Sequence, residues 1–273
     1  TGPYRTRPAY DMIVQALSGA MSMTGTKDGP AVRSAIPIGD LAAGLHGALA
    51  LSAALYRQQA TGEGESIDIS MLDCLVSMLN YQGMYHLASG NVPGRQGRGH
   101  DSVPTYRAFE AGEGTELVIT ANTERMWQEL CRVLGREELV DDPRFLDSAL
   151  RLQNRDELWA EIEPAFLART ADQWCDELND AGVPAATVQD VGAALADEHV
   201  RSREMVMTLQ HDDGTQASFL GDPIKLEEAK RTDYRFPPRL GEDTRAVLTE
   251  LGLEASEIDD LEAQGAVASS PER

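Results

Sequence analysis

The chain has 273 residues, of which 42% are hydrophobic, and its formal net charge is −21. The apolar share is that of a globular protein and excludes an intrinsically disordered chain. The excess of Asp and Glu over Lys and Arg, 45 against 24, argues against nucleic acid and against an anionic membrane as partners. Up to residue 107, 8 basic residues balance 8 acidic ones, so an anionic ligand is expected to bind in this first part.

Apolar spacing predicts a helix over 11–23 and a second one over 40–59. The second is apolar around most of its circumference and is expected to be buried. Its most apolar stretch, 41–56, contains two glycines, a histidine and a serine, which favours a buried helix over a membrane span. Alternation over 65–71 predicts a strand, and 72–87 is predicted to be helical.

A loop rich in glycine and arginine, 91–101, predicts the main domain boundary. Beyond it, the pattern predicts strands over 106–109, 116–120, 186–188 and 217–220, and helices over 124–134, 154–168, 171–181, 242–251 and 257–264. We therefore expect three parts. Residues 1–100 carry the long apolar helix, 101–215 form a small acidic α+β domain, and 216–273 return to the first part.

The cysteines and histidines predict neither a disulfide framework nor a metal centre. Cys74, Cys131 and Cys175 are far apart and odd in number, which indicates a reducing compartment and small buried side chains. The five histidines lack the spacing of metal ligands. We expect no bound metal and no redox cofactor.

Asp40 follows Gly39 at the start of the predicted helix over 40–59. In one interpretation it is an N-cap, which accepts hydrogen bonds from the free N–H groups of the first turn. In another, the helix N-terminus keeps the carboxylate ionised, and it acts as a nucleophile toward an activated acyl group. Small residues at 42–44 would leave room for a substrate. The spacing alone leaves both interpretations open.

A series of short motifs, in this order and spacing, resembles the family III CoA-transferases, the CaiB/BaiF family. The motifs are RPAYD (7–11), MTG (23–25), PIGD (37–40), TGEG (61–64), DISMLD (68–73), DPRF (142–145), AGVP (181–184) and LGEDT (240–244). Each is weak alone, but the ordered set is specific and covers nearly the whole chain. The resemblance also implies a preceding nucleotide-type α/β part that supplies much of the CoA pocket, and we expect the chain to lack it.

The resemblance implies an α/β protein with the family III CoA-transferase fold. This fold combines a large domain, here a partial Rossmann-like one, with a smaller α+β domain, and family members form interlocked homodimers. It implies a cytoplasmic enzyme whose substrates are acyl-CoA esters and carboxylic acids, without a further cofactor. Asp40 matches the family's nucleophile, which forms an aspartyl-CoA thioester. A carboxylate needs no general base for this role.

Further site residues follow from the same resemblance. Asp11 matches an acidic residue near the reacting centre, although a first-turn surface carboxylate is an alternative. Met71 matches a residue that touches CoA, although core packing on a strand would also explain it. Gly97 and Gly99 lie where the family has a flexible glycine-rich lid, and an interdomain linker is the alternative. The candidates for the CoA phosphates are Arg7 and also Arg5, Arg33, Arg95 and Arg98.

Two alternatives to transfer remain. The α-methylacyl-CoA racemases of the same superfamily use a histidine at the position of Tyr10. A tyrosine, with an ordinary pKa of about 10, is poorly matched to proton exchange near neutral pH, which favours a transferase. The other alternative is a catalytically incomplete fragment or partner subunit.

Overall fold

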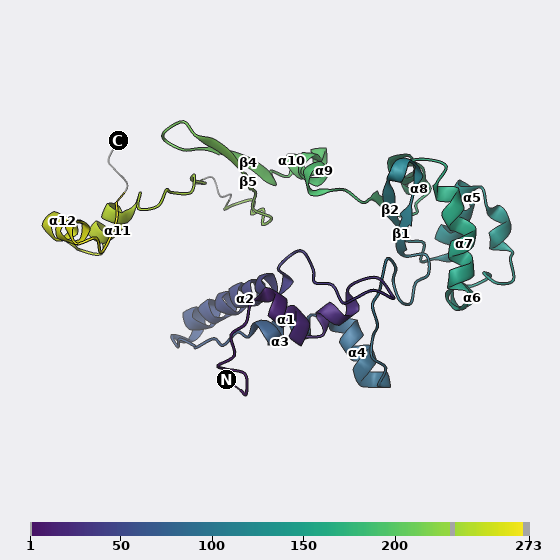
Figure 1. Cartoon of the computed structure of the whole chain (residues 1–273), viewed down its shortest axis with the longest axis horizontal. Coiled ribbons are helices and arrows are strands. Elements are labelled where there is room, and N and C mark those ends of the chain that lie inside the picture. The colour runs from purple at the N-terminus through teal and green to yellow at the C-terminus, as the bar shows by residue number, and fades with distance from the viewer. Residues whose placement is uncertain (1, 230–232, 270–273) are drawn as a thin grey trace. The chain divides into compact units, whose positions relative to one another are not determined.

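The computed structural model describes residues 2–229 and 233–269 (Figure 1). Contacts within the chain divide it into two compact units, Thr1–Val188 and Gln189–Arg273. The division into 1–100, 101–215 and 216–273 stays a prediction, and residues 230–232 and 270–273 of its last part lie outside the described residues.

The first hundred residues fold into short helices around one long helix. These elements are α1 (Asp11–Leu17), the 3₁₀ turn η1 (Ala20–Met23), α2 (Ile38–Thr61), α3 (Met71–Ser77) and α4 (Asn80–Ser89). The single helix predicted over 11–23 is interrupted at Gly19, whose φ is 88°. The helix predicted over 72–87 is divided before Asn80, whose φ is 49°. Both positions adopt the left-handed conformation, which interrupts a helix.

The strand predicted over 65–71 is wrong. In the described part of the chain no segment pairs with it, and 63–70 carries no regular secondary structure. Alternating side chains form a strand only where a neighbour satisfies the backbone N–H and C=O groups. Instead, the Ser70 side chain accepts the N–H of Asp73 at 3.3 Å and caps α3. Met71 is therefore the first residue of a helix.

The expectation that the long apolar helix is buried is also wrong for the described chain. α2 packs against α1 and α3 through a small core of Val14, Ala42, Cys74 and Leu75. Most of its other large side chains are exposed, with Leu45 at 72% and Leu49 at 70% of full exposure. By length and hydropathy alone, α2 could also cross a membrane, which for a single helix is weak evidence.

Residues 105–188 contain the main hydrophobic core. They comprise β1 (Arg107–Glu110), η2 (Gly112–Gly114), β2 (Glu116–Ile119), α5 (Glu124–Leu134), η3 (Glu137–Val140), α6 (Ser148–Gln153), α7 (Arg155–Phe166), α8 (Ala171–Asp180) and β3 (Ala185–Thr187). The strands form an antiparallel sheet in the order β1-β2-β3. Phe109, Trp127, Leu158 and Phe166 are almost fully buried in this core. The strands predicted over 106–109 and 116–120 and the helices predicted over 124–134 and 171–181 are confirmed here.

The unit Gln189–Arg273 contains α9 (Val191–Ala196), α10 (Glu198–Ser202), β4 (Val206–Gln210), β5 (Gln216–Leu220), α11 (Thr244–Glu250) and α12 (Ala255–Ala263). β4 and β5 form an antiparallel hairpin, of which the sequence predicted only the second strand. The buried His211 at the end of β4 lies 3.0 Å from a carboxylate oxygen of Glu242. This contact ties the hairpin to the segment that precedes α11.

Candidate active site

Asp11, the first residue of α1, links this helix to the first turn of α2. Its Oδ1 accepts a hydrogen bond from the backbone N–H of Gly39 at 2.8 Å. A Cβ at position 39 would lie 3.1 Å from that same oxygen, closer than most carbon contacts. Glycine at this position therefore lets the carboxylate reach the helix backbone, and Asp11 serves as a cap supplied by another helix.

A buried glutamine extends this connection. The Gln15 side chain, 1% exposed, donates from Nε2 to Asp11 Oδ2 at 2.7 Å. Its Oε1 accepts the backbone N–H of Ser34 at 2.8 Å. The segment 34–39 is thus held to α1 at both ends by polar groups. Gln15 is not among the site residues predicted from the sequence. The available signal was a polar residue beside Val14, four positions after Asp11 on one helix face.

Asp40 is the third residue of α2 and comes directly after this connection. The N-cap residue is Pro37, so the interpretation of Asp40 as N-cap is wrong. Its side chain is exposed, and no residue in the described ranges donates a hydrogen bond to it. A carboxylate in the first turn is favoured by the positive end of the helix dipole. The carboxylate oxygens of Asp40 are therefore free of hydrogen bonds within the described residues and lie next to a backbone that Asp11 and Gln15 hold in place.

The other predicted residues lie on separate parts of the first hundred residues. Met71 begins α3, which packs against both α1 and α2. Arg7 lies before α1, with its guanidinium 3.8 Å from the centre of the Tyr4 ring. Tyr10, immediately before α1, is 81% exposed. Asp11 and Gly39 are thus the predicted residues whose contact the structure establishes, and Asp40 follows Gly39 in the first turn of α2.

The other arginines proposed for the CoA phosphates differ in whether their side chains already have a partner. Arg98 forms ion pairs with Glu110 at 3.3 Å and Glu116 at 2.9 Å, so its charge is already compensated. Arg95 donates to the carbonyl of Thr26, and Arg33 to that of Ser34. Arg5 has no side-chain partner in the described part of the chain. Arg5 and Arg7 are therefore the candidates with no acidic partner and no hydrogen bond from the side chain.

The glycine-rich loop lies against the segment that follows η1. The N–H of Gly97 donates to the carbonyl of Gly25 at 3.0 Å, and the N–H of Gln96 donates to that of Met23 at 3.0 Å. Gly97 has a φ of 63°, which suits glycine. A Cβ at Gly99 would lie 3.0 Å from Arg107 Cβ, so this position needs a small residue. The lid role of the loop stays a prediction.

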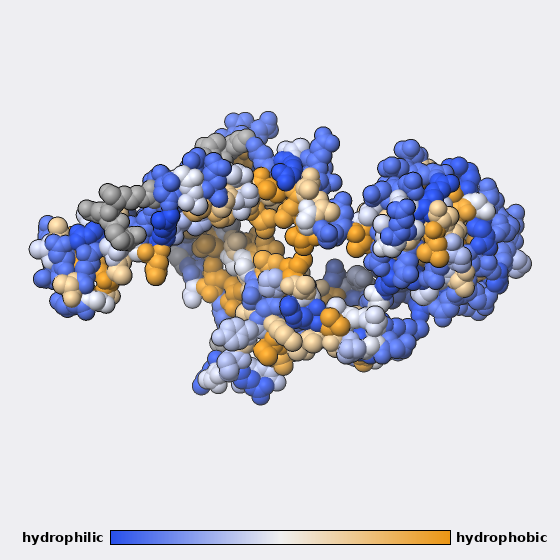
Figure 2. Space-filling model, turned by 45° about the horizontal axis from the view of Figure 1, so that its top comes forward, coloured by the Kyte–Doolittle hydropathy of each residue, from blue (hydrophilic) through white to orange (hydrophobic). Residues whose placement is uncertain are grey.

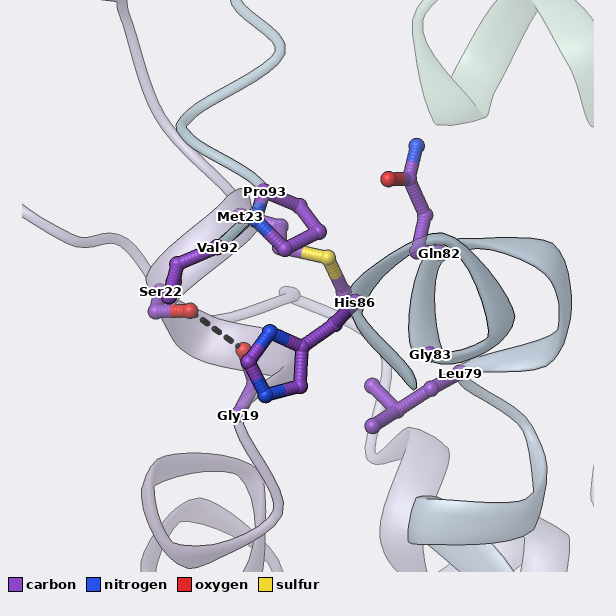
Figure 3. Close-up of a pocket in the computed structure, with 9 residues that line it drawn as sticks. All are labelled: Gly19, Ser22, Met23, Leu79, Gln82, Gly83, His86, Val92 and Pro93. Atoms are coloured by element: carbon purple, nitrogen blue, oxygen red, sulfur yellow. Dashed lines mark hydrogen bonds between the residues drawn. The ribbon is translucent and has the colours of Figure 1, made fainter. Parts of the chain in front are cut away.

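A small pocket opens between η1, α4 and residues 92–93 (Figure 3). Its volume is about 180 Å³, and Met23, Leu79, Val92 and Pro93 supply apolar surface. Gln82 and His86 from α4 line it as well. No sequence motif predicts this pocket, because its lining residues are scattered between positions 19 and 93.

The cysteines are free and buried, and they are poor candidates for chemistry. Burial raises the pKa of the Cys131 thiol to about 12 and also raises the pKa of Cys175. A thiol with a raised pKa is a weak nucleophile at neutral pH. In the ranges 2–229 and 233–269, no group of three or more His, Cys, Asp or Glu side chains is arranged to hold a metal ion.

Comparison with known proteins decides the family. The sequence model described as CoA-transferase family III matches residues 1–244. The chain belongs to this family. The family resemblance that the sequence indicated is thereby confirmed. The family III chain also shares its fold with solved structures: a CaiB/BaiF family protein from Brucella suis superimposes with a TM-score of 0.80 at 31% identity, covering 92% of this chain and 65% of that one.

Curated relatives of this family III chain are named as CoA-transferases. An acyl-CoA transferase of Fusarium pseudograminearum is 35% identical over 98% of this chain and 59% of its own length. A succinyl-CoA:glutarate CoA-transferase of Mus musculus is 31% identical over 98% of this chain and 61% of its own length. The chain thus spans about three fifths of the length of these relatives.

Proposed function

We propose that the chain carries the nucleophile of a CoA-transferase, which moves CoA from an acyl-CoA thioester to a carboxylic acid. The observation that carries the proposal is the free carboxylate of Asp40 in the first turn of α2, next to a backbone that Asp11 and Gln15 hold. Family membership and the names of the relatives support this chemistry.

In the proposed reaction an oxygen of Asp40 attacks the thioester carbonyl and expels the CoA thiolate, which leaves a mixed anhydride. The thiolate then attacks the aspartyl carbonyl, and the donor acid departs as a carboxylate. The product on the protein is an aspartyl-CoA thioester. The acceptor carboxylate attacks it to give a second anhydride and free thiolate. The thiolate finally attacks the acceptor's carbonyl, which releases the new acyl-CoA and restores the Asp40 carboxylate.

The other site residues support this step in different ways. Asp11 acts as a positioning residue, because its carboxylate is engaged by Gly39 and Gln15. Gly39 allows close approach, Met71 contacts CoA, and Arg7 binds a CoA phosphate through paired N–H donors of its guanidinium group. The loop with Gly97 and Gly99 excludes water from the anhydrides. Coenzyme A esters are substrates, and the reaction uses no metal or further cofactor.

We also propose that the protein is a cytoplasmic homodimer. The exposed leucines of α2 are the surface that a second copy would cover, because large apolar surfaces on soluble proteins mark contact sites. Figure 2 shows hydrophobic patches on the visible surface, whereas the part that carries α5–α8 is largely hydrophilic outside. Contact with a second copy would account for the apolar character of α2, so this helix need not cross a membrane.

The test is covalent labelling of Asp40. The full-length gene product containing this sequence is incubated with succinyl-CoA and a panel of short dicarboxylic acids, and the peptides are analysed by mass spectrometry. We expect CoA on Asp40, which hydroxylamine converts to a hydroxamate. Asp40→Asn should lose transfer by several orders of magnitude, because an amide cannot form the thioester. Its stability should fall by at most about 1 kcal/mol, the size of a charge–dipole interaction.

Asp73→Asn is the matched control, since Asp73 is exposed and is also the third residue of its helix, α3. It should transfer CoA at the native rate. Near-native transfer by Asp40→Asn would refute the mechanism. Exchange of the α-proton in heavy water without labelling would identify a racemase instead. A wild-type protein that neither labels nor exchanges would be a catalytically incomplete subunit.

A further inference from the structure

A carboxylate oxygen at the end of the glycine-rich loop 91–101 is buried without a hydrogen bond. Asp101 Oδ2 accepts a hydrogen bond from Nε2 of Gln82, on α4, at 3.0 Å. Its other oxygen, Oδ1, accepts none within the described residues. The Nδ1 atom of His100 lies 3.2 Å from this Oδ1, at hydrogen-bond distance. Because an unpaired buried oxygen costs free energy, a state in which Nδ1 carries a proton for it is favoured.

The neutral form of His100 has no proton to offer at this place. The backbone N–H of Ser102 donates to Nδ1 at 3.2 Å, so this nitrogen presents a lone pair. The neutral ring then carries its proton on Nε2, which lies 3.3 Å from the hydroxyl oxygen of Tyr81 on α4. A second proton binds at Nδ1, where it faces Asp101 Oδ1. Protonation therefore exchanges a contact with the N–H of the exposed Ser102 for a charge-assisted hydrogen bond to a buried oxygen.

Aromatic neighbours hold the His100 ring in this position. The ring stacks on Tyr81 and on Tyr106, with 5.9 Å and 5.7 Å between the ring centres. The backbone N–H of His100 also donates to the carbonyl of Tyr106 at 2.8 Å. The side chains of His100 and Asp101 are 26% and 29% exposed, so water can deliver the proton. The ring is thus already placed for the new hydrogen bond before it is protonated.

Positive charges on the neighbouring segments act against a second proton on His100, but they are paired with carboxylates. The pairs are Arg155–Asp156 at 3.9 Å, Arg107–Glu163 at 2.9 Å and Arg98–Glu116 at 2.9 Å. Arg155, on α7, approaches the contact itself, with Nη1 3.5 Å from the carbonyl oxygen of Asp101. The Asp101 carboxylate lies closer to Nδ1 of His100 and favours the second proton.

We propose that His100 and Asp101 form a proton-dependent clasp, which ties the end of the glycine-rich loop more firmly to α4 when His100 is protonated. Asp101 is attached to α4 through Gln82, and His100 through Tyr81, so the same helix anchors both partners. The closed clasp gives the second proton a partner that an open loop lacks, so a falling pH favours the closed state.

The direction of the pH effect follows from the two partners. The added stability of the loop is present at low pH and is lost as the pH rises and the ring gives up its second proton. Histidine ordinarily changes its charge between pH 5 and 8, whereas a carboxylate such as that of Asp101 ordinarily stays ionised there. The clasp does not depend on the proposed function, although an effect of the clasp on CoA transfer would.

The test measures deuterium exchange of the backbone amides of residues 97–100 in the full-length gene product that contains this sequence. Exchange is followed by mass spectrometry at about pH 5.5 and about pH 8, within the range in which histidine ordinarily titrates, and is corrected for the intrinsic exchange rate at each pH. Among these amides, Gly97 donates to the carbonyl of Gly25 and His100 to that of Tyr106. We expect protection to be roughly three- to ten-fold greater at the lower pH, the effect of one additional hydrogen bond.

Two variants remove one partner of the clasp each. His100→Phe keeps an aromatic ring beside Tyr81 and Tyr106 but cannot bind a proton. Asp101→Asn keeps the size of the side chain, and its amide can donate to the neutral Nδ1. Both variants should lose the greater protection at low pH. His86→Gln is the matched control, because His86 contacts the opposite end of the loop, with Nδ1 3.0 Å from the carbonyl oxygen of Asn91. It should keep the wild-type pH dependence.

Equal protection of the wild-type loop at the two pH values would overturn the proposal. Greater protection at low pH that persists in Asp101→Asn or in His100→Phe would also overturn it, provided that the variant's circular dichroism shows a folded chain. A pH dependence that disappears in His86→Gln would assign the effect to the other end of the loop and would equally overturn it. None of these rates depends on Asp40, so labelling of that residue and closure of the clasp fail or succeed separately.

Discussion

The position of Asp40 depends on residues that carry no chemistry themselves. Gly39 has no side chain, so Asp11 reaches the backbone of α2 at 2.8 Å. Gln15 orients Asp11 and also binds Ser34, which fixes the segment before the helix. Family motifs led from the sequence to Asp11, Gly39 and Asp40. Gln15 was missed, because its spacing from Asp11 indicates only a shared helix face, whereas the packing of α1 shows that its amide is buried between two polar partners.

We predict that Gln15→Leu impairs catalysis more than substrate binding. The substitution leaves Asp11 Oδ2 and the N–H of Ser34 without their partner, which should lower the free energy of unfolding by about 1–3 kcal/mol. Looser placement of Asp40 should lower kcat, while KM for the CoA ester changes little. Steady-state kinetics and denaturant unfolding measure the two effects.

Gln58→Leu makes the same change at an exposed position of α2 and should alter neither kcat nor the free energy of unfolding. Asp11→Asn is a second variant of the same connection. It keeps an oxygen for Gly39 but turns an N–H group toward Gln15, so kcat should fall again. If Gln15→Leu lowers stability while kcat stays native, Gln15 has a structural role alone.

At the scale of elements, the bounds of helices and strands were predicted best where an element's own residues supply its cap, its buried face and its end. α5 has Thr123 as a cap, a buried face that includes Trp127 and Leu130, and Gly135 at its end, and it matches its predicted bounds. The strand predicted over 65–71 failed, because a strand needs a partner that its own residues do not specify. Likewise, β4 was missed because its partner β5 makes it a strand.

A carboxylate in the hairpin of β4 and β5, that of Asp213, should make the stability of the protein depend on pH. The N–H of Thr215 donates to Asp213 Oδ1 at 2.8 Å. This backbone hydrogen bond, together with Thr215's side chain and the charges of Arg239 and His211, lowers the pKa of Asp213 from 3.8 to about 2. The lowered pKa means that folding favours the ionised carboxylate. The contribution to stability is therefore complete above the ordinary pKa and is lost as the pH falls through about 2.

Thermal unfolding of Asp213→Asn should consequently differ most from wild type above pH 3.8, and the two should converge toward pH 2. Asp212→Asn, at the adjacent exposed position, should follow the wild-type curve throughout. A constant gap between Asp213→Asn and wild type across this range would contradict the role of the Asp213 charge.

At the scale of the whole molecule, charge and apolar surface are separated along the sequence. The excess of acidic residues lies after residue 107, whereas α2 exposes its leucines in the neutral first part. Amino-acid pattern alone predicted a buried helix, because an apolar circumference normally faces a core. The core available within the described chain fully buries only Gly39 and Ala42 of this helix. Burial of the remaining face therefore requires another chain or a further segment.

We predict that the leucines of α2 hold two copies together. Leu45 and Leu49 are one helical turn apart and are exposed by 72% and 70%. Burying each leucine contributes about 1.5–3 kcal/mol, so the double variant Leu45→Asp and Leu49→Asp should weaken the dimer by at least about a hundred-fold. Sedimentation velocity over a concentration series measures this. Gln58→Asp and Gln59→Asp add the same charge near the end of α2, at exposed positions, and should leave the dimer intact. If the wild-type chain stays monomeric and floats with lipid vesicles, the leucines contact a membrane surface instead. If the double variant stays dimeric, the interface lies elsewhere.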